Sequence, residues 1–123
     1  MKLLSSLVLS LVIVAVTATQ SYALYWAAAA GTTGFPLVAY NYPSMSGATT
    51  SALHRCGADG LGDCKIVASG TSGCFAAAAN GANPPRRAYA TATRKFDAES
   101  KALAACAALH AGKCQTVYLG CPS

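Results

Sequence analysis

An internal repeat with a period of about 50 residues limits the folds open to this chain more than any other feature. Two cysteines, a leucine, a valine and a glycine recur in register, in the pattern A-x3-A-L-x2-C-x7-C-x2-V-x2-G. The chain is therefore expected to form two similar units, covering about residues 25–70 and 75–121. Upstream, Trp26 to Ala30 match Phe75 to Ala79, and Ala39-Tyr40 match Ala88-Tyr89. The matched positions of the pattern are Ala48, Ala52, Leu53, Cys56, Cys64, Val67 and Gly70 with Ala98, Ala102, Leu103, Cys106, Cys114, Val117 and Gly120.

Each unit is predicted to contain two strands, a helix and a third strand. Runs of four alanines favour helix by propensity, but each run lies in a segment of about six residues that turn formers end, which is too short for a stable helix. We expect an α+β fold in which the two repeats share one antiparallel sheet, as one domain of residues 24–123. The clearest predicted elements are strands at Tyr25 to Ala30, Leu37 to Tyr42 and Arg86 to Thr93, a helix capped by Ser44 or Ser46 that runs to about Cys56, and a helix from Lys95 to Leu109.

Residues 1–23 have the features of a secretory signal peptide. Lys2 precedes an apolar stretch from Leu3 to Val16, and a small-residue site ends at Ala23. The apolar stretch is shorter than the roughly 20 residues that cross a bilayer, so an uncleaved membrane anchor is the weaker alternative. We expect cleavage after Ala23, no transmembrane segment in the mature chain, and a periplasmic or secreted product.

All six cysteines follow this leader, and an even number in a small exported chain indicates three disulfides. The first cysteine of C-x7-C ends a helix and the second begins the strand that returns beside it, which brings the two within bonding range. Fifteen pairings of six cysteines are formally open, with exchange among Cys64, Cys74, Cys114 and Cys121 as the main alternative. The favoured pairs are Cys56–Cys64, Cys106–Cys114 and, by remainder, Cys74–Cys121.

Three motifs resemble a known family. They are the W-A-A-A-A opening, the A-E-x2-A-L-x2-C helix from Ala98 to Cys106, and the closing G-K-C-Q-x-V. They are similar to domain-of-unknown-function family 4189, small secreted bacterial proteins with this strand and helix repeat. The resemblance implies export and this fold, and it offers no catalytic residues to carry over. The chain departs from the family where alanine replaces glycine and tryptophan in the first strands, and where its first helix lacks the acid that Glu99 supplies in the second.

No pattern for catalysis or metal binding is found in the sequence. His54 and His110 do not occupy matching repeat positions, and Gly70 to Gly73 lacks the spacing of a nucleophile elbow. The spacings typical of zinc ligands do not occur. Asp59 and Asp63 are most simply part of a polar turn, because the alternating oxygen ligands of a calcium loop are missing. We therefore predict no catalytic residue, no metal and no cofactor.

Basic residues are concentrated in the second repeat. The whole chain has a formal net charge of +5, and loss of Lys2 with the leader lowers it to about +4. Strand alternation is expected to point Arg87, Tyr89 and Thr91 outward. Such a face suits an anionic partner, although the sequence has no specific nucleic-acid motif and an ordinary soluble surface is the plainer interpretation. The predicted basic and aromatic face consists of Arg86, Arg87, Tyr89, Arg94, Lys95 and Lys101.

These features favour an exported, non-enzymatic interaction or binding protein whose partner is unknown. One alternative is a small extracytoplasmic hydrolase or redox-active protein, which would need a free thiol or a strained disulfide. Another is a purely structural component of the cell envelope.

Overall fold

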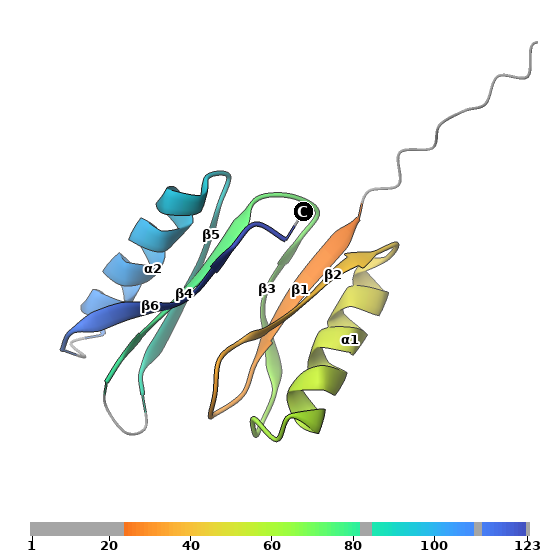
Figure 1. Ribbon diagram of the computed structural model, residues 1–123, viewed down its shortest axis with the longest axis horizontal. Coiled ribbons are helices and arrows are strands. Elements are labelled where there is room, and N and C mark those ends of the chain that lie inside the picture. Colours follow the sequence, from red (N-terminus) through yellow and green to blue (C-terminus); the bar gives the residue numbers. More distant parts are fainter. Residues whose placement is uncertain (1–23, 82–84, 110–111, 123) are drawn as a thin grey trace, which may run out of the picture.

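The computed structural model describes residues 24–81, 85–109 and 112–122 (Figure 1). The predicted signal peptide, residues 1–23, lies outside the described residues. Within them the order strand, strand, helix, strand occurs twice, and the α+β class is confirmed. The elements are β1 (Tyr25–Ala30), β2 (Leu37–Tyr42), α1 (Met45–Ala58), β3 (Lys65–Gly70), β4 (Cys74–Asn80), β5 (Arg87–Ala92), α2 (Lys95–Ala108) and β6 (Cys114–Gly120).

The strands form two separate antiparallel sheets, in the orders β2-β1-β3 and β5-β4-β6. The expectation of one shared sheet is therefore wrong. The reason is that each sheet has two apolar faces and its helix covers only one of them. The remaining faces, which carry Trp26 and Ala28 in the first half and Phe75 and Ala77 in the second, are buried against each other.

The sheets instead stack face to face, and each helix covers one outer face, so that the layers run α1, first sheet, second sheet, α2 (Figure 1). The centre strands β1 and β4 are buried on both faces, which explains why they carry alanine without polar alternation. Small side chains let each helix pack closely on its sheet. The clusters between helix and sheet contain Ala27, Ala29, Ala39, Ala48, Ala52 and Cys56 in the first half, and Cys74, Ala76, Ala78, Ala88, Ala98, Ala102 and Cys106 in the second.

The space between the two sheets holds the largest buried side chains. Trp26 of β1 and Phe75 of β4 are fully buried there, with ring centroids 5.9 Å apart. The indole N–H of Trp26 also donates to the carbonyl of Ser72, in the connection between the halves, at 3.3 Å. Aromatic rings bury more apolar area than any other side chain, so this pair is the main apolar contact between the two halves.

The three disulfides are those that the sequence favoured: Cys56–Cys64, Cys74–Cys121 and Cys106–Cys114. The two short ones fasten each helix to the strand that follows it. The long one joins the start of β4 to the residue after β6. All six cysteines of the chain are consequently paired.

The helices begin differently in the two halves. The side chain of Ser44 accepts a hydrogen bond from the backbone N–H of Gly47 at 3.0 Å, so this serine caps α1 as predicted. The equivalent residue before α2 is Arg94, whose side chain makes no such bond. Asp97 in the first turn of α2 instead places a negative charge near the positive end of the helix dipole.

The second strands of the two halves do not align as the sequence match suggested. Pairing places Val38 opposite Ala28, and Tyr89 opposite Ala77. Ala28 and Ala77 are equivalent in the repeat, so Tyr89 occupies the position of Val38 and not that of Tyr40. The match of the two Ala-Tyr pairs is therefore displaced by two residues.

Candidate functional site

The structure splits the predicted basic face into two groups. Arg86 and Arg87 lie at the start of β5, whereas Arg94 is the N-cap residue of α2 beyond the other end of β5, and Lys95 and Lys101 lie in the first half of that helix. An extended strand rises about 3.3 Å per residue, so the two groups are roughly 20 Å apart. They cannot act as one continuous patch on a small ligand.

The first group makes contacts within the protein. One guanidinium nitrogen of Arg86 donates to the carbonyl of Leu109 at 2.9 Å, and one of Arg87 donates to the carbonyl of Gly31 at 3.0 Å. The second bond crosses from one half of the molecule to the other. Both arginines thus satisfy backbone acceptors, and Arg87 helps to hold the two halves together.

The prediction that Tyr89 points outward is wrong. This side chain is half-buried between the sheets and stacks on Phe75, with centroids 6.1 Å apart and planes inclined by 15°. Strand alternation correctly places Tyr89 on the same side of β5 as Arg87, but an outward orientation requires a sheet with one face in water. Because the second sheet is covered on both faces, the side of β5 that carries Arg87 and Tyr89 faces the first sheet.

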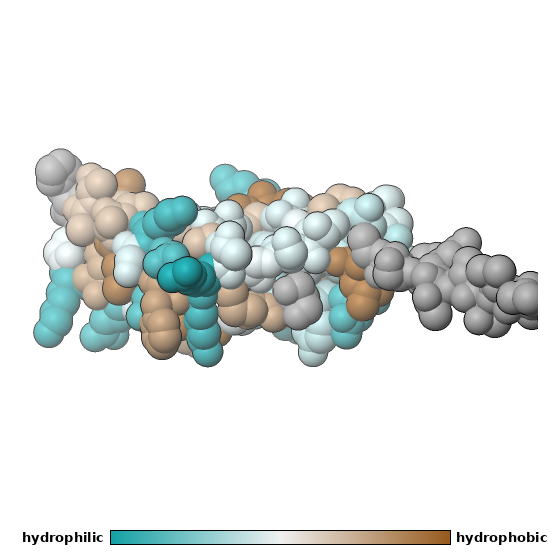
Figure 2. Space-filling model, turned by 90° about the horizontal axis from the view of Figure 1, so that it is seen from above, coloured by the Kyte–Doolittle hydropathy of each residue, from teal (hydrophilic) through white to brown (hydrophobic). Residues whose placement is uncertain are grey.

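The second basic group lies at an open hollow of about 640 Å³ at the start of α2. Arg94 and Lys101 line it together with Asp97 and Ser100, whereas Lys95 does not. Figure 2 looks onto this end of the molecule and shows the most hydrophilic side chains gathered over the half that contains α2. The structure therefore brings together only two of the six predicted residues in one depression.

The other residues considered from the sequence form no assembled centre. His54 is exposed on α1, and His110 lies outside the described residues. Asp59 is the residue that ends α1. In the part of the chain that the structure describes, no three His, Cys, Asp or Glu side chains come together as metal ligands would, and neither helix has the length and apolar character needed to cross a bilayer.

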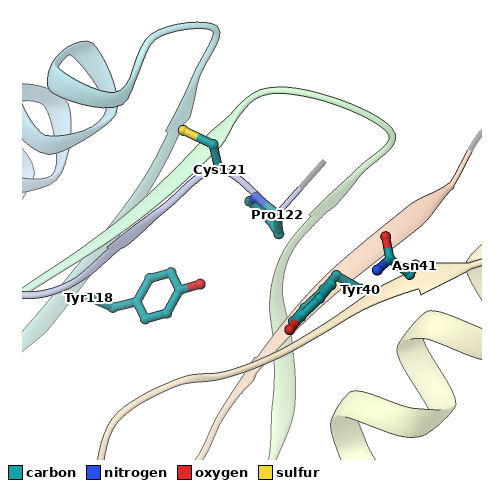
Figure 3. Close-up of a pocket in the computed structure, with 5 residues that line it drawn as sticks. All are labelled: Tyr40, Asn41, Tyr118, Cys121 and Pro122. Carbon is teal, nitrogen blue, oxygen red and sulfur yellow. The ribbon is translucent and has the colours of Figure 1, made fainter.

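A cleft that sequence reasoning missed lies between β2 of the first sheet and the end of β6 in the second (Figure 3). It has a volume of about 340 Å³, and we call it the tyrosine cleft. Its lining residues are Tyr40, Asn41, Tyr118, Cys121 and Pro122. The hydroxyl of Tyr118 points across the cleft toward Tyr40, and the sulfur of Cys121 points away from it (Figure 3). The walls are thus two phenol side chains, an amide and a proline ring.

One wall of the cleft is shaped by a bulge in β2. Tyr25 pairs with Tyr42 and Ala27 with Ala39, so that Tyr40 and Asn41 together face the single residue between Tyr25 and Ala27 on β1. Asn41 has φ of 66°, a left-handed conformation that asparagine adopts more readily than other residues with a side chain. The extra residue leaves Tyr40 55% exposed at the edge of the sheet.

The opposite wall is Tyr118, which is supported from within the core. Its ring contacts Phe75 at a centroid distance of 5.5 Å. Its hydroxyl lies over Gly120, where a Cβ atom would come within 2.9 Å of the phenol oxygen. Burial raises the pKa of Tyr118 above the ordinary 10.0, and Tyr40 nearby raises it further. The phenol therefore stays neutral and can donate a hydrogen bond at all physiological pH values.

Two weak signals in the sequence could have pointed to this cleft. Asn41 before Tyr42-Pro43 is a residue type suited to positive φ, and Gly120 next to an aromatic residue allows a ring to lie on the backbone. Neither signal indicates that β2 and β6, far apart in the sequence, meet at one edge of the stacked sheets.

The fold and these sites define a class: a small four-layer α+β protein whose helices and strands are fastened by three disulfides. The model of the family described as Domain of unknown function (DUF4189) matches residues 15–121, and the chain belongs to this family. Comparisons with curated proteins and with solved structures each gave no match.

Proposed function

We propose that this protein is exported and works outside the cytoplasm as a non-enzymatic binding protein, with the tyrosine cleft as its binding site. The observation that carries the proposal is the exposed aromatic ring of Tyr40 beside a left-handed Asn41, both lining a cavity. Residues in rare backbone conformations and β-bulges are concentrated at binding sites. The lining groups suit recognition by surface contact and hydrogen bonding.

Both walls of the cleft are anchored to the rest of the fold, which favours binding because little order has to be gained when a ligand arrives. Tyr118 packs on the core ring of Phe75, and Cys121 is fastened to β4 through Cys74. On the other side, Tyr42 anchors the end of β2, because its hydroxyl donates to the hydroxyl of Ser51 on α1.

Export is supported by the leader-like residues 1–23 and by the use of every cysteine in a disulfide, which is typical of oxidising compartments. The test is to express the full chain in a bacterial host and measure the intact mass of the product. We expect an N-terminus at Leu24 and no thiol that reacts with iodoacetamide under native conditions. A cytoplasmic product that retains residues 1–23 would overturn the export proposal, and a reactive native thiol would favour the redox alternative.

The binding site can be tested without knowledge of the natural ligand. A library of small uncharged, cationic and anionic fragments is screened by nitrogen-15 NMR against the purified protein and against Tyr40→Ser. We expect bound fragments to shift the resonances of Tyr40, Asn41 and Tyr118, and the variant to lose these responses. If no fragment shifts the cleft residues, the binding proposal fails and a purely structural role is favoured.

An anionic partner at the hollow beside α2 is a second candidate, favoured by the cations of Arg94 and Lys101 next to the hydroxyl of Ser100. The carboxylate of Asp97 in the same hollow disfavours an anion, because it repels negative charge. The test is retention of the protein on heparin for Arg94→Ser with Lys101→Ser, with Arg55→Ser with Lys65→Ser as the charge-matched control in the first half. Equal losses in both variants would mean that retention reflects net charge alone.

A further inference from the structure

We infer that the tyrosine cleft recognises an uncharged, hydroxyl-rich ring, that is, a sugar unit of a neutral carbohydrate. This inference rests on the proposed binding function and adds the chemical class of the ligand. It is argued from the charge of the lining, from its aromatic and hydrogen-bonding groups, and from its size.

The lining favours a ligand without charge. None of the five lining residues carries a formal charge at neutral pH. Burial and Tyr40 both raise the pKa of Tyr118, so its phenol does not supply a negative charge for a cation. Without Lys2 of the leader the chain keeps a formal net charge of about +4, which also disfavours cations. An anion would lose hydration in the cleft without gaining a positive partner there.

The groups that line the cleft match the two kinds of surface on a sugar ring. The exposed ring of Tyr40 offers a flat π face of negative potential, against which the polarised C–H bonds on one face of a pyranose can pack. The hydroxyls of Tyr40 and Tyr118 and the side-chain amide of Asn41 both donate and accept hydrogen bonds. A ligand with alternating hydroxyl groups can use each of them.

The size and shape of the cleft fit a short piece of such a polymer. Its volume of about 340 Å³ is at the lower end of the range of about 300–1,000 Å³ that is typical of small-molecule sites. The cleft is open to solvent, so a longer chain could extend beyond it. A proline-rich peptide is the nearest competing ligand, but its helix is usually held by several aromatic residues in series, and this cleft has two.

The experiment titrates the purified protein, expressed from the full chain, with cellobiose, maltose and N,N′-diacetylchitobiose, and follows the cleft resonances by NMR. Digalacturonate is the charged probe of equal size, and hexaproline is the peptide probe. We expect saturable shifts of Tyr40, Asn41 and Tyr118 with at least one neutral disaccharide, and affinity for digalacturonate that is weaker by about tenfold or more.

Two variants separate recognition from folding. Tyr40→Ser removes an exposed ring and should weaken disaccharide binding by about tenfold or more, whereas Tyr40→Phe keeps the ring, loses one hydroxyl and should weaken it by about threefold. Tyr89→Phe is the matched control, because this tyrosine lies at the other edge of the sheets, and it should bind as the unchanged protein does.

The outcomes distinguish the ligand class from the binding function. If digalacturonate or hexaproline shifts the cleft residues and the neutral disaccharides do not, the carbohydrate class is overturned while the cleft remains a binding site. If disaccharides shift residues outside the cleft, or bind Tyr40→Ser undiminished, the carbohydrate class is likewise overturned. If none of the five probes shifts the resonances of the cleft residues, the carbohydrate class is overturned too. The fragment screen then decides whether the cleft binds anything.

Discussion

The two edges of the stacked sheets are built from the same kinds of strand, but their tyrosine side chains are placed differently. At one edge β3 faces β5, and Tyr89 stacks on Phe75 between the sheets, where it lines a hollow of about 200 Å³ together with Ala68 of β3. At the other edge β2 faces β6, and Tyr118 occupies the place beside Phe75. There Tyr40 is 55% exposed and stands at the surface. We call the first edge, which has the smaller hollow, the closed edge, and the second the open edge.

The difference arises from two local changes between the repeats. The repeat equates Ala68 with Tyr118, so the inward ring is supplied by β5 at the closed edge and by β6 at the open edge. The bulge in β2 then adds one residue that β5 lacks, since β4 and β5 pair without interruption. The larger cleft at the open edge thus arises from one extra residue and one relocated ring.

The largest expected effect comes from cutting the disulfide that anchors the open edge. Cys74→Ser with Cys121→Ser should lower the free energy of unfolding by about 4 kcal/mol, because the bond closes a long loop of the unfolded chain. Cys56→Ser with Cys64→Ser, which opens a short loop away from the open edge, should cost about 2.5 kcal/mol. Urea unfolding followed by circular dichroism measures both. A smaller loss for the long bond than for the short one would contradict this order.

The second effect compares the tyrosines of the two edges directly. Tyr89→Ala removes a half-buried ring from Phe75 and should cost about 2 kcal/mol of stability, less than the 3–5 kcal/mol typical of a fully buried aromatic. Tyr40→Ala removes an exposed ring and should change stability by less than about 0.5 kcal/mol. Thermal unfolding of the two variants gives the comparison. Equal losses of stability in the two variants would mean that the ring of Tyr40 also packs against the core.

These two edges also show how far the sequence could be interpreted. The strand and helix order and the two short disulfides follow from local signals: turn residues around short alanine runs, a serine cap, and cysteines placed at the end of a helix and the start of a strand. Each of these depends on residues near one another in the chain. That is why they were predicted correctly.

The stacking of two sheets and the tyrosine cleft depend on contacts between distant segments. Alanine runs fit one sheet or two equally well, because alanine has no side chain large enough to indicate which face it packs against. The orientation of Tyr89 was consequently wrong, and Tyr40 was not recognised as part of a site. Only the meeting of β2 with β6 brings Tyr40 and Tyr118 to one cleft.

The third effect concerns the bulge that distinguishes the edges. Asn41→Val places a β-branched residue at φ of 66° and should cost about 1–2 kcal/mol. Thr91→Val, at an exposed position in the regular strand β5, should change stability by less than about 0.5 kcal/mol. Asn41→Gly accepts the same φ without strain and serves as the control. If Asn41→Val is as stable as the original protein, the bulge does not require the left-handed conformation.

The smallest expected effect is a dependence of the free energy of unfolding on pH, which Tyr118 at the open edge adds under alkaline conditions. Burial, and then Tyr40, raise the pKa of Tyr118 above its unfolded value of about 10. As pH rises past 10, the unfolded chain loses this proton before the folded one does, so the folded protein binds more protons and its stability falls. Well below pH 10 both the folded and the unfolded state keep the proton, and Tyr118 then does not make the free energy of unfolding depend on pH.

Replacing the two tyrosines in turn separates the two causes of that slope. Tyr118→Phe should remove its contribution to the decline in stability above pH 10, measured by urea unfolding at a series of alkaline pH values. Tyr40→Phe should reduce the decline without abolishing it, because burial, the larger cause, is unchanged. If Tyr40→Phe removes the slope completely, the interaction across the cleft outweighs burial, and the two phenols form a more tightly coupled pair than their packing indicates.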